Sequence, residues 1–73
     1  MHDERDIWKR LANLPRLLTL QQVARELGVS IWTVRRAIWD GELPQVRIGR
    51  SIRIDRHDLE FWLARQKVRG PVL

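Results

Sequence analysis

The chain contains no cysteine, and its two histidines, His2 and His57, lie far apart with no cluster of carboxylates beside them. The lack of cysteine excludes disulfide frameworks, thiolate metal sites and cysteine nucleophiles. The remaining residues show neither metal-ligand spacing nor a nucleophile accompanied by a base. We therefore expect a protein that is not an enzyme and that carries no metal or other cofactor.

Long apolar segments are also missing. The longest apolar run is FWLA at residues 61 to 64, and the first residues carry mixed charges without an apolar core. A membrane-spanning helix needs about 20 apolar residues, and a signal peptide needs an apolar stretch near its start. We therefore expect no membrane partner and a location in the cytoplasm.

Lysine is scarce, so the positive charge comes almost entirely from arginine. Fourteen Lys and Arg against nine Asp and Glu give a net charge of +5, and only Lys9 and Lys67 are lysines. The planar fork of arginine suits phosphates and base edges. With 44% hydrophobic residues and four tryptophans among 73 residues, the composition is that of one small folded domain, not of a disordered basic tail.

Apolar spacing and end signals predict the first two helices. Residues 3 to 13 place isoleucine and leucine at helical spacing, and Pro15 predicts that this helix stops just before it. A second helix is predicted over residues 19 to 27, TLQQVAREL, because Thr19 and Gln22 have the spacing of a capping box.

A short turn leads to a third helix. Gly28 is expected to close the second helix in a left-handed conformation, and Ser30 is expected to cap the next one, over residues 30 to 41. Two short helices joined by so short a turn are typical of a helix-turn-helix. On or near the outer face of the later helix we expect Ile31, Trp32, Thr33, Arg35 and Arg36.

A β-hairpin is predicted in VRIGRSIRI, residues 46 to 54. Pairing Ile48 with Ile52 would put every aliphatic side chain on one face and leave residues 49 to 51 as a three-residue loop with Arg50 at its tip. In that register Arg47 would pair with Arg53, a like-charge contact that destabilises the hairpin unless an anion lies nearby. The pairing therefore points to an anionic partner.

Asp55 is expected to cap a last helix over residues 56 to 67. The apolar stripes of the helices predict a core of Leu20, Val23, Ala24, Leu27, Val34, Ala37, Ile38, Leu59, Trp62 and Leu63.

Four aromatic residues remain to be placed. We expect Trp8 to pack the first helix onto the domain and Trp39 to fill space beside the small Ala37. Trp32 would either contact a thymine methyl or sugar or be covered by a neighbouring protein. Phe61 either belongs to a wide inner stripe or lies in an interface.

Nine of the twelve arginines fall into two groups. Those on helices with acids nearby are expected to cover a solvated surface: Arg5, Arg10, Arg25 and Arg65. Five others gather on the second helix of the helix-turn-helix and on the hairpin, where acids flank the elements without interleaving: Arg35, Arg36, Arg47, Arg50 and Arg53. A basic patch on such a motif favours nucleic-acid contact, with the helix in the major groove and the hairpin tip in the minor groove.

Residues 18 to 65 resemble the excisionase-type, MerR-like winged helix-turn-helix family. The resemblance rests on four pieces in order, LGVS..TV, GELP, VRIGRS.RI and DLE.WL. It implies a mainly α fold with a small β-hairpin, and the N-terminal helix predicted from apolar spacing is extra to this shared core. Residues 1–15 would form the extension, and residues 16–69 would form the winged helix-turn-helix domain.

The resemblance also implies site residues. Six residues would face the major groove: Ser30, Ile31, Trp32, Thr33, Arg35 and Arg36. The wing would contribute Arg47, Arg50, Ser51 and Arg53. Phosphate contacts would come from Thr19 and Gln21, as well as from Ser30. Family members commonly have polar or basic residues at the positions of Ile31 and Trp32, so DNA shape and the helix arginines would carry more of the recognition here.

Three functions follow as hypotheses. The first is a phage or mobile-element excisionase that binds DNA repeats head to tail and cooperatively, bends the DNA and assists a tyrosine integrase. The second is a small transcriptional regulator that binds direct repeats in promoters. The third, from another class, is a protein-interaction module that uses Trp32, Trp39 and Phe61, and it predicts no salt-dependent DNA binding.

Overall fold

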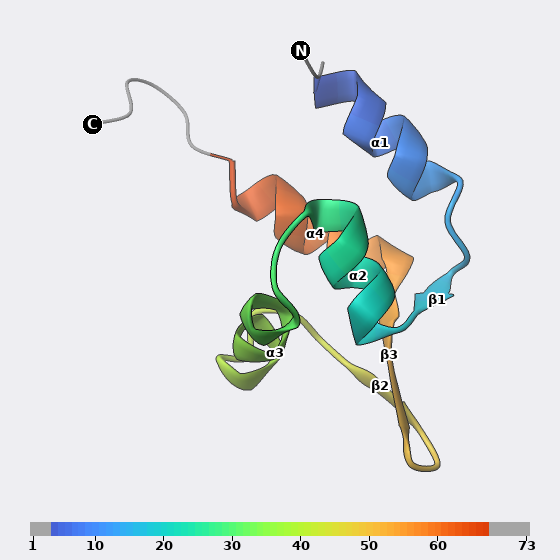
Figure 1. The fold of residues 1–73 in the computed structure, drawn as a ribbon, viewed down its shortest axis with the longest axis vertical. Helices are drawn as coiled ribbons and strands as arrows, with labels where there is room; N and C mark the ends of the chain where they lie inside the picture. Colours follow the sequence, from blue (N-terminus) through green and yellow to red (C-terminus); the bar gives the residue numbers. More distant parts are fainter. Residues whose placement is uncertain (1–3, 68–73) are drawn as a thin grey trace.

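Four helices and three short strands follow one another along residues 4–67, the part of the chain that the computed structural model describes (Figure 1). In chain order they are α1 (Glu4–Ala12), β1 (Leu17–Leu18), α2 (Leu20–Leu27), α3 (Ile31–Trp39), β2 (Val46–Ile48), β3 (Ser51–Asp55) and α4 (Arg56–Arg65). This confirms the predicted fold class, which is mainly α with a small hairpin.

The helix boundaries are set by the end signals that the sequence carries. The Thr19 side chain accepts a hydrogen bond from the Gln22 backbone, and the Gln22 side chain accepts one from the Thr19 backbone, so the predicted capping box is confirmed. Ser30 caps α3 and Asp55 caps α4, as expected. Gly28 ends α2 at φ 69°, a left-handed conformation that favours glycine.

The sheet has three antiparallel strands in the order β1-β3-β2. Leu18 of β1 lies opposite Ile54 of β3, and both side chains are fully buried. This pairing fastens the base of the hairpin to the core. Strand β1 was not predicted, because two residues are too few to show the alternation of a strand.

The predicted hairpin register is wrong. Val46 pairs with Arg53, and Ile48 pairs with Ser51, which leaves only Gly49 and Arg50 in the loop. Gly49 has φ 60°, and a two-residue loop with a left-handed glycine in first position matches the twist of the flanking strands. Turn geometry therefore overrides the alternation of aliphatic residues.

The corrected register separates two arginines. Arg47 pairs with Ile52, and Arg53 pairs with Val46, so Arg47 and Arg53 lie on opposite faces of the hairpin. The predicted like-charge contact between them is absent. Ile48 is 54% exposed, so burial contributes little to choosing the register near the tip.

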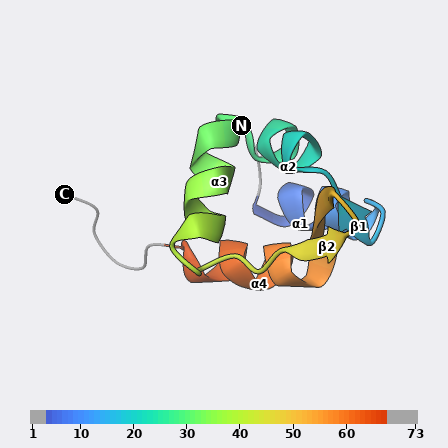
Figure 2. The same ribbon diagram turned by 90° about the horizontal axis from the view of Figure 1, so that it is seen from below.

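The core lies between α2, α3, α4 and the base of the hairpin, which Figure 2 shows arranged around a common centre. Its buried side chains are Leu11, Leu18, Val23, Ala24, Val34, Ala37, Leu43, Ile54, Leu59 and Trp62. All of the predicted stripe residues are either among these or are half-buried against them. Leu18 and Leu43 were not predicted because they lie in connections without helical periodicity.

Helix α1 packs on the same core. Leu11 is fully buried, and Trp8 is half-buried with the ammonium of Lys67 over its ring at 5.1 Å, so the expected packing of Trp8 is confirmed. Arg10 forms a 2.7 Å ion pair with Glu26 of α2. Among residues 4–67, no helix is both long and apolar enough to cross a membrane.

Candidate nucleic-acid interface

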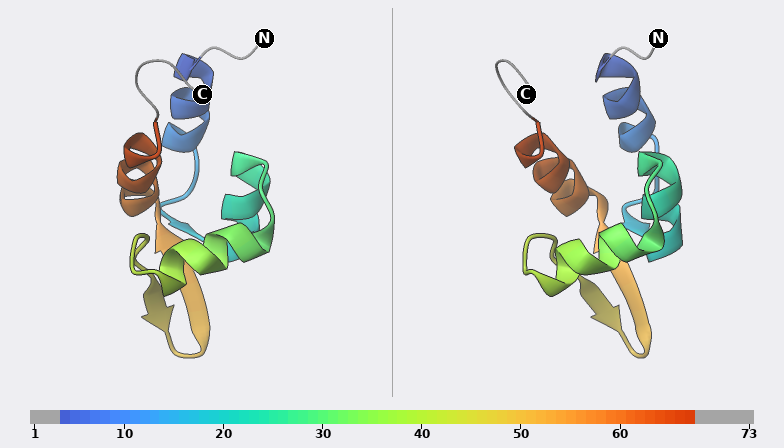
Figure 3. Two further views of the ribbon diagram at one scale, coloured as in Figure 1. Left: turned by 90° about the vertical axis from the view of Figure 1, so that its left-hand side faces the viewer. Right: turned by 60° about the vertical axis from the view of Figure 1, so that its left-hand side comes forward.

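Helix α3 and the hairpin β2–β3 lie at the same end of the molecule, away from α1 (Figure 3). Helix α2 packs against α3 as the first helix of the helix-turn-helix. In such motifs the second helix enters the major groove. The end formed by α3 and the hairpin is therefore the candidate interface with double-stranded DNA.

Four of the predicted residues on α3 do face solvent: Trp32, Thr33, Arg35 and Arg36. Ile31 differs, because it is half-buried and packs against the core. It lies one helical turn before Val34, so it continues the inner stripe at the start of the helix. The expected outward position of Ile31 is therefore wrong.

The two neighbouring arginines of α3 have different surroundings. Arg36 lies 3.9 Å from Asp40, one turn later, in a pair whose side chains are both largely exposed. Arg35 forms no ion pair or hydrogen bond with the rest of residues 4–67. Exposed pairs of this kind contribute little to stability. Both guanidinium groups are thus available to an anionic partner at little cost.

The hairpin presents its arginines unequally. Arg47 and Arg50 are exposed, and within the described part of the chain neither has an ion-pair or hydrogen-bond partner. Ser51 is exposed beside them. Arg53 is half-buried, and its Nη1 donates a hydrogen bond to the Ile52 carbonyl oxygen at 3.0 Å. Arg47 and Arg50 are therefore the more accessible wing arginines.

The three predicted phosphate-contact residues lie at or near helix N-termini. The hydroxyl oxygens of Thr19 and Ser30 already accept hydrogen bonds from the backbones of Gln22 and Thr33. Gln21 is exposed in the first turn of α2. Unsatisfied backbone N–H groups at helix N-termini attract phosphate, so these positions suit a DNA backbone.

Two tryptophans dominate the outer face of α3. Trp32 is 58% exposed and Trp39 is 79% exposed, and their rings meet edge to face with centroids 6.3 Å apart. The prediction that Trp39 fills space beside Ala37 is therefore wrong. Helix periodicity turns Trp39 outward, two turns after Trp32, while Ile38 takes the inward position.

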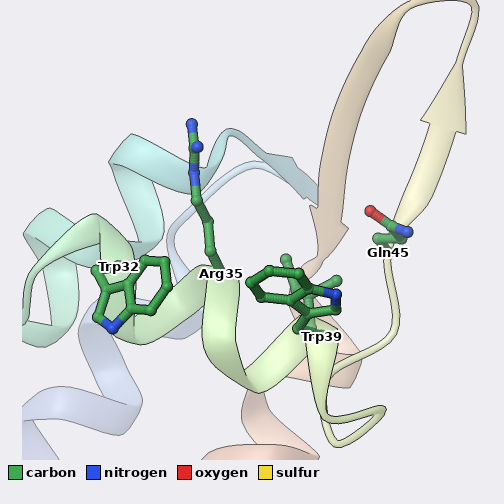
Figure 4. A pocket seen from close by; sticks show the side chains of 5 residues that line it. Trp32, Arg35, Trp39 and Gln45 are labelled. Atoms are coloured by element: carbon green, nitrogen blue, oxygen red, sulfur yellow. The ribbon is translucent and has the colours of Figure 1, made fainter.

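A shallow hollow of about 500 Å³ lies over these rings, lined by Trp32, Arg35, Ile38, Trp39 and Gln45 (Figure 4). A second hollow of about 260 Å³ continues toward the hairpin and is lined by Leu20, Arg35, Ile38, Gln45 and Ile52. Arg35 and Gln45 are the polar groups common to both. Sequence reasoning missed Gln45, since nothing but its place after Pro44 distinguished it.

Asp55 fixes the root of the hairpin. Its carboxylate accepts a hydrogen bond from the His57 backbone N–H at 2.8 Å, and this bond, followed by the Arg16 guanidinium 3.3 Å away, lowers the pKa of Asp55 despite some desolvation. His57 itself is exposed. Residues 4–67 contain no group of three or more His, Cys, Asp or Glu placed to hold a metal ion.

A family of helix-turn-helix domains matches residues 17–67. The chain is also 50% identical, over 48 residues, to the excisionase of Mycobacterium phage D29, an alignment that covers 64% of this chain and 86% of that protein. The chain belongs to the excisionase-type helix-turn-helix family. Its helix-turn-helix is thus a DNA-binding domain.

Two further relatives match shorter portions of their own chains. The protein named "Putative DNA-binding protein Rv0500A" of Mycobacterium tuberculosis H37Rv is 53% identical over 38 residues, which cover 52% of this chain and 49% of that one. An uncharacterized protein of Bacillus subtilis is 37% identical over 54 residues, 74% of this chain and 18% of that one. The chain therefore spans half or less of these two relatives.

Proposed function

We propose that this protein is an excisionase, a recombination directionality factor that makes a tyrosine integrase run excision in preference to integration. The observation that carries the proposal is the match to a phage excisionase over 86% of that protein's length. The exposed arginines at one end of the fold support it. The protein itself would catalyse no strand exchange.

On DNA, α3 would lie in the major groove and the hairpin would act as a wing in the adjacent minor groove. Arg35 and Arg36 would read base edges, because a guanidinium matches the acceptor pair of guanine. The tip of the wing is narrow enough to enter a minor groove, and Arg50 lies at this tip. Arg47 would contact the flanking phosphates.

Copies of the chain would bind DNA repeats side by side, head to tail and cooperatively. A wing in one minor groove and a helix in the next major groove hold the DNA at two points, and bending between them is a common result for such architectural proteins. The bent DNA would bring the arms of the attachment site to the integrase. The location would be the cytoplasm of a bacterium, on its nucleoid.

The test is a recombination assay with purified components. Integrase is incubated with a plasmid carrying two attachment junctions, with and without this protein. Excision that depends on the protein, with unchanged or reduced integration, is the expected result. Equal excision in its presence and absence contradicts the proposal, even when the protein binds the DNA.

The alternative is a transcriptional regulator that binds direct repeats in a promoter. The similarity to a mycobacterial protein with a DNA-binding name favours it, since that name carries no link to recombination. Footprinting separates the two functions. Protected repeats beside an integrase gene and its attachment core favour the excisionase, whereas protected repeats over a promoter, with altered transcript levels, favour the regulator.

A further inference from the structure

Trp32 and Trp39 expose apolar surface on the very helix that carries the DNA-binding function. Both rings are more than half exposed, and they contact one another edge to face at 87°. Such a contact restrains both side chains before any partner arrives. We call these two exposed rings the aromatic wall. An exposed apolar surface of this kind is typical of a site that binds an apolar partner surface.

Arg35 lies between the two tryptophans along α3. It is one turn after Trp32 and one turn before Trp39, and Figure 4 shows its side chain extending away from the helix, with the guanidinium beyond both rings. Arg35 is the one charged residue that lines the hollow, and nothing in residues 4–67 neutralises it. The positive charge favours DNA as the occupant over a second copy of this chain, which is itself basic.

The chemistry of the wall selects one feature of DNA. An indole has a single N–H donor and no acceptor, so it cannot recognise a base by a pair of hydrogen bonds. The thymine methyl is the apolar group that the base edges present in the major groove. A guanidinium in the same place matches O6 and N7 of guanine.

The distance between the two rings is similar to the spacing of nearby bases in DNA. The two ring centroids are 6.3 Å apart, which is close to two base-pair steps of about 3.4 Å each. Arg35, which stands between the two tryptophans along α3, would then face the base pair between the two that the rings cover.

We propose that Trp32 and Trp39 bind thymine methyl groups that flank a guanine read by Arg35. The inference rests on the proposed DNA-binding function and adds the bases that α3 prefers.

The experiment begins with selection of bound duplexes from a random DNA library by the full chain. Thymines of the selected site are then replaced one at a time by deoxyuridine, which removes only the methyl group. At a contacted position, the wild-type affinity is expected to fall about 3- to 5-fold. Replacing the neighbouring guanine by 7-deazaguanine is expected to lower it at least about fivefold.

Variants assign the effect to the rings. With Trp32→Ala or Trp39→Ala, the affinity for the thymine site is expected to fall, and the deoxyuridine substitution is expected to cost nothing further at the position which that ring covers. Phe61→Ala is the matched control, since Phe61 is an equally exposed aromatic residue, 68% exposed, on α4. It is expected to bind like the wild type and to keep the deoxyuridine effect.

Two results overturn the inference while leaving DNA binding intact. One is that deoxyuridine changes nothing at any thymine although the tryptophan variants bind more weakly. The other is that these variants lose only the complexes with several protein copies, which would make a second copy the occupant. A wild-type chain that selects no duplex at low salt contradicts the proposed function itself.

Discussion

Arg56 Nη1 donates a hydrogen bond to the carbonyl oxygen of Leu14 at 2.7 Å. The same nitrogen lies 3.0 Å from the carbonyl oxygen of Ala12, the last residue of α1. A guanidinium from the first turn of α4 thus satisfies backbone acceptors at the end of α1. Arg56 is consequently a structural residue that joins the N-terminal helix to the domain, unlike the exposed arginines of α3 and the hairpin.

Replacing Arg56 by methionine is expected to destabilise the fold by about 1.5–3 kcal/mol, because two backbone carbonyl groups lose a charged donor, and the hydrogen bond to Leu14 is partly buried. Urea denaturation of the two proteins measures the difference. Arg65→Met, at an exposed position on the same helix, serves as the control and is expected to change little. Equal stability of the Arg56 variant and the wild type contradicts this role.

Gly49→Ala is expected to destabilise the hairpin by about 1–2 kcal/mol, because alanine is strained at φ 60°. A Cβ at this position meets no atom within 4 Å, so the cost is one of backbone conformation and not of crowding. Amide hydrogen exchange in β2 and β3 measures the local loss. Unchanged protection of these amides would show that the loop tolerates a side chain at its first position.

Acid is expected to weaken the fold partly through Asp55. Because the pKa of this carboxyl is lower in the folded chain, its stabilising effect is complete above the unfolded pKa of about 3.9 and is lost as the pH falls toward the folded pKa. Asp55→Asn keeps a capping acceptor but does not titrate. Melting temperatures between pH 2 and 6 are expected to vary less with pH in the variant, and parallel curves would contradict this.

Arg36→Ala is expected to weaken DNA binding and to relax base preference by about 1–3 kcal/mol at one position of the site. Competition between the selected duplex and single-base variants measures both effects. The control is Arg65→Ala on α4. Equal loss on specific and random DNA would assign Arg36 to phosphate contact instead.

Local signals in the sequence predicted the helices well. The capping box at Thr19 and the left-handed Gly28 act over three or four residues, so they can be recognised without knowledge of the fold. The hairpin shows the limit of such reasoning. Its register depends on the two-residue turn that Gly49 allows and on the small buried area near the tip. The pattern of aliphatic residues indicates neither the turn type nor the buried area.

The candidate site was predictable to a similar degree. Helix periodicity correctly placed Trp32, Arg35 and Arg36 outside. It did not show that the ring of Trp39 meets that of Trp32, or that Gln45 borders the same hollow. The contact between the rings depends on the side-chain rotamers of two residues on α3, and the place of Gln45 depends on how the link after α3 folds back.

The most direct measurement is a gel-shift titration of the wild type, Arg50→Ala and Arg65→Ala on attachment-site DNA at 50 and 200 mM salt. If about five phosphates are neutralised, wild-type affinity falls roughly 10²–10³-fold between the two salt concentrations. Arg50→Ala is expected to bind more weakly, with a salt slope smaller by about one, while Arg65→Ala matches the wild type. Absence of a shift at low salt, or equal binding by all three proteins, would contradict DNA binding through the wing.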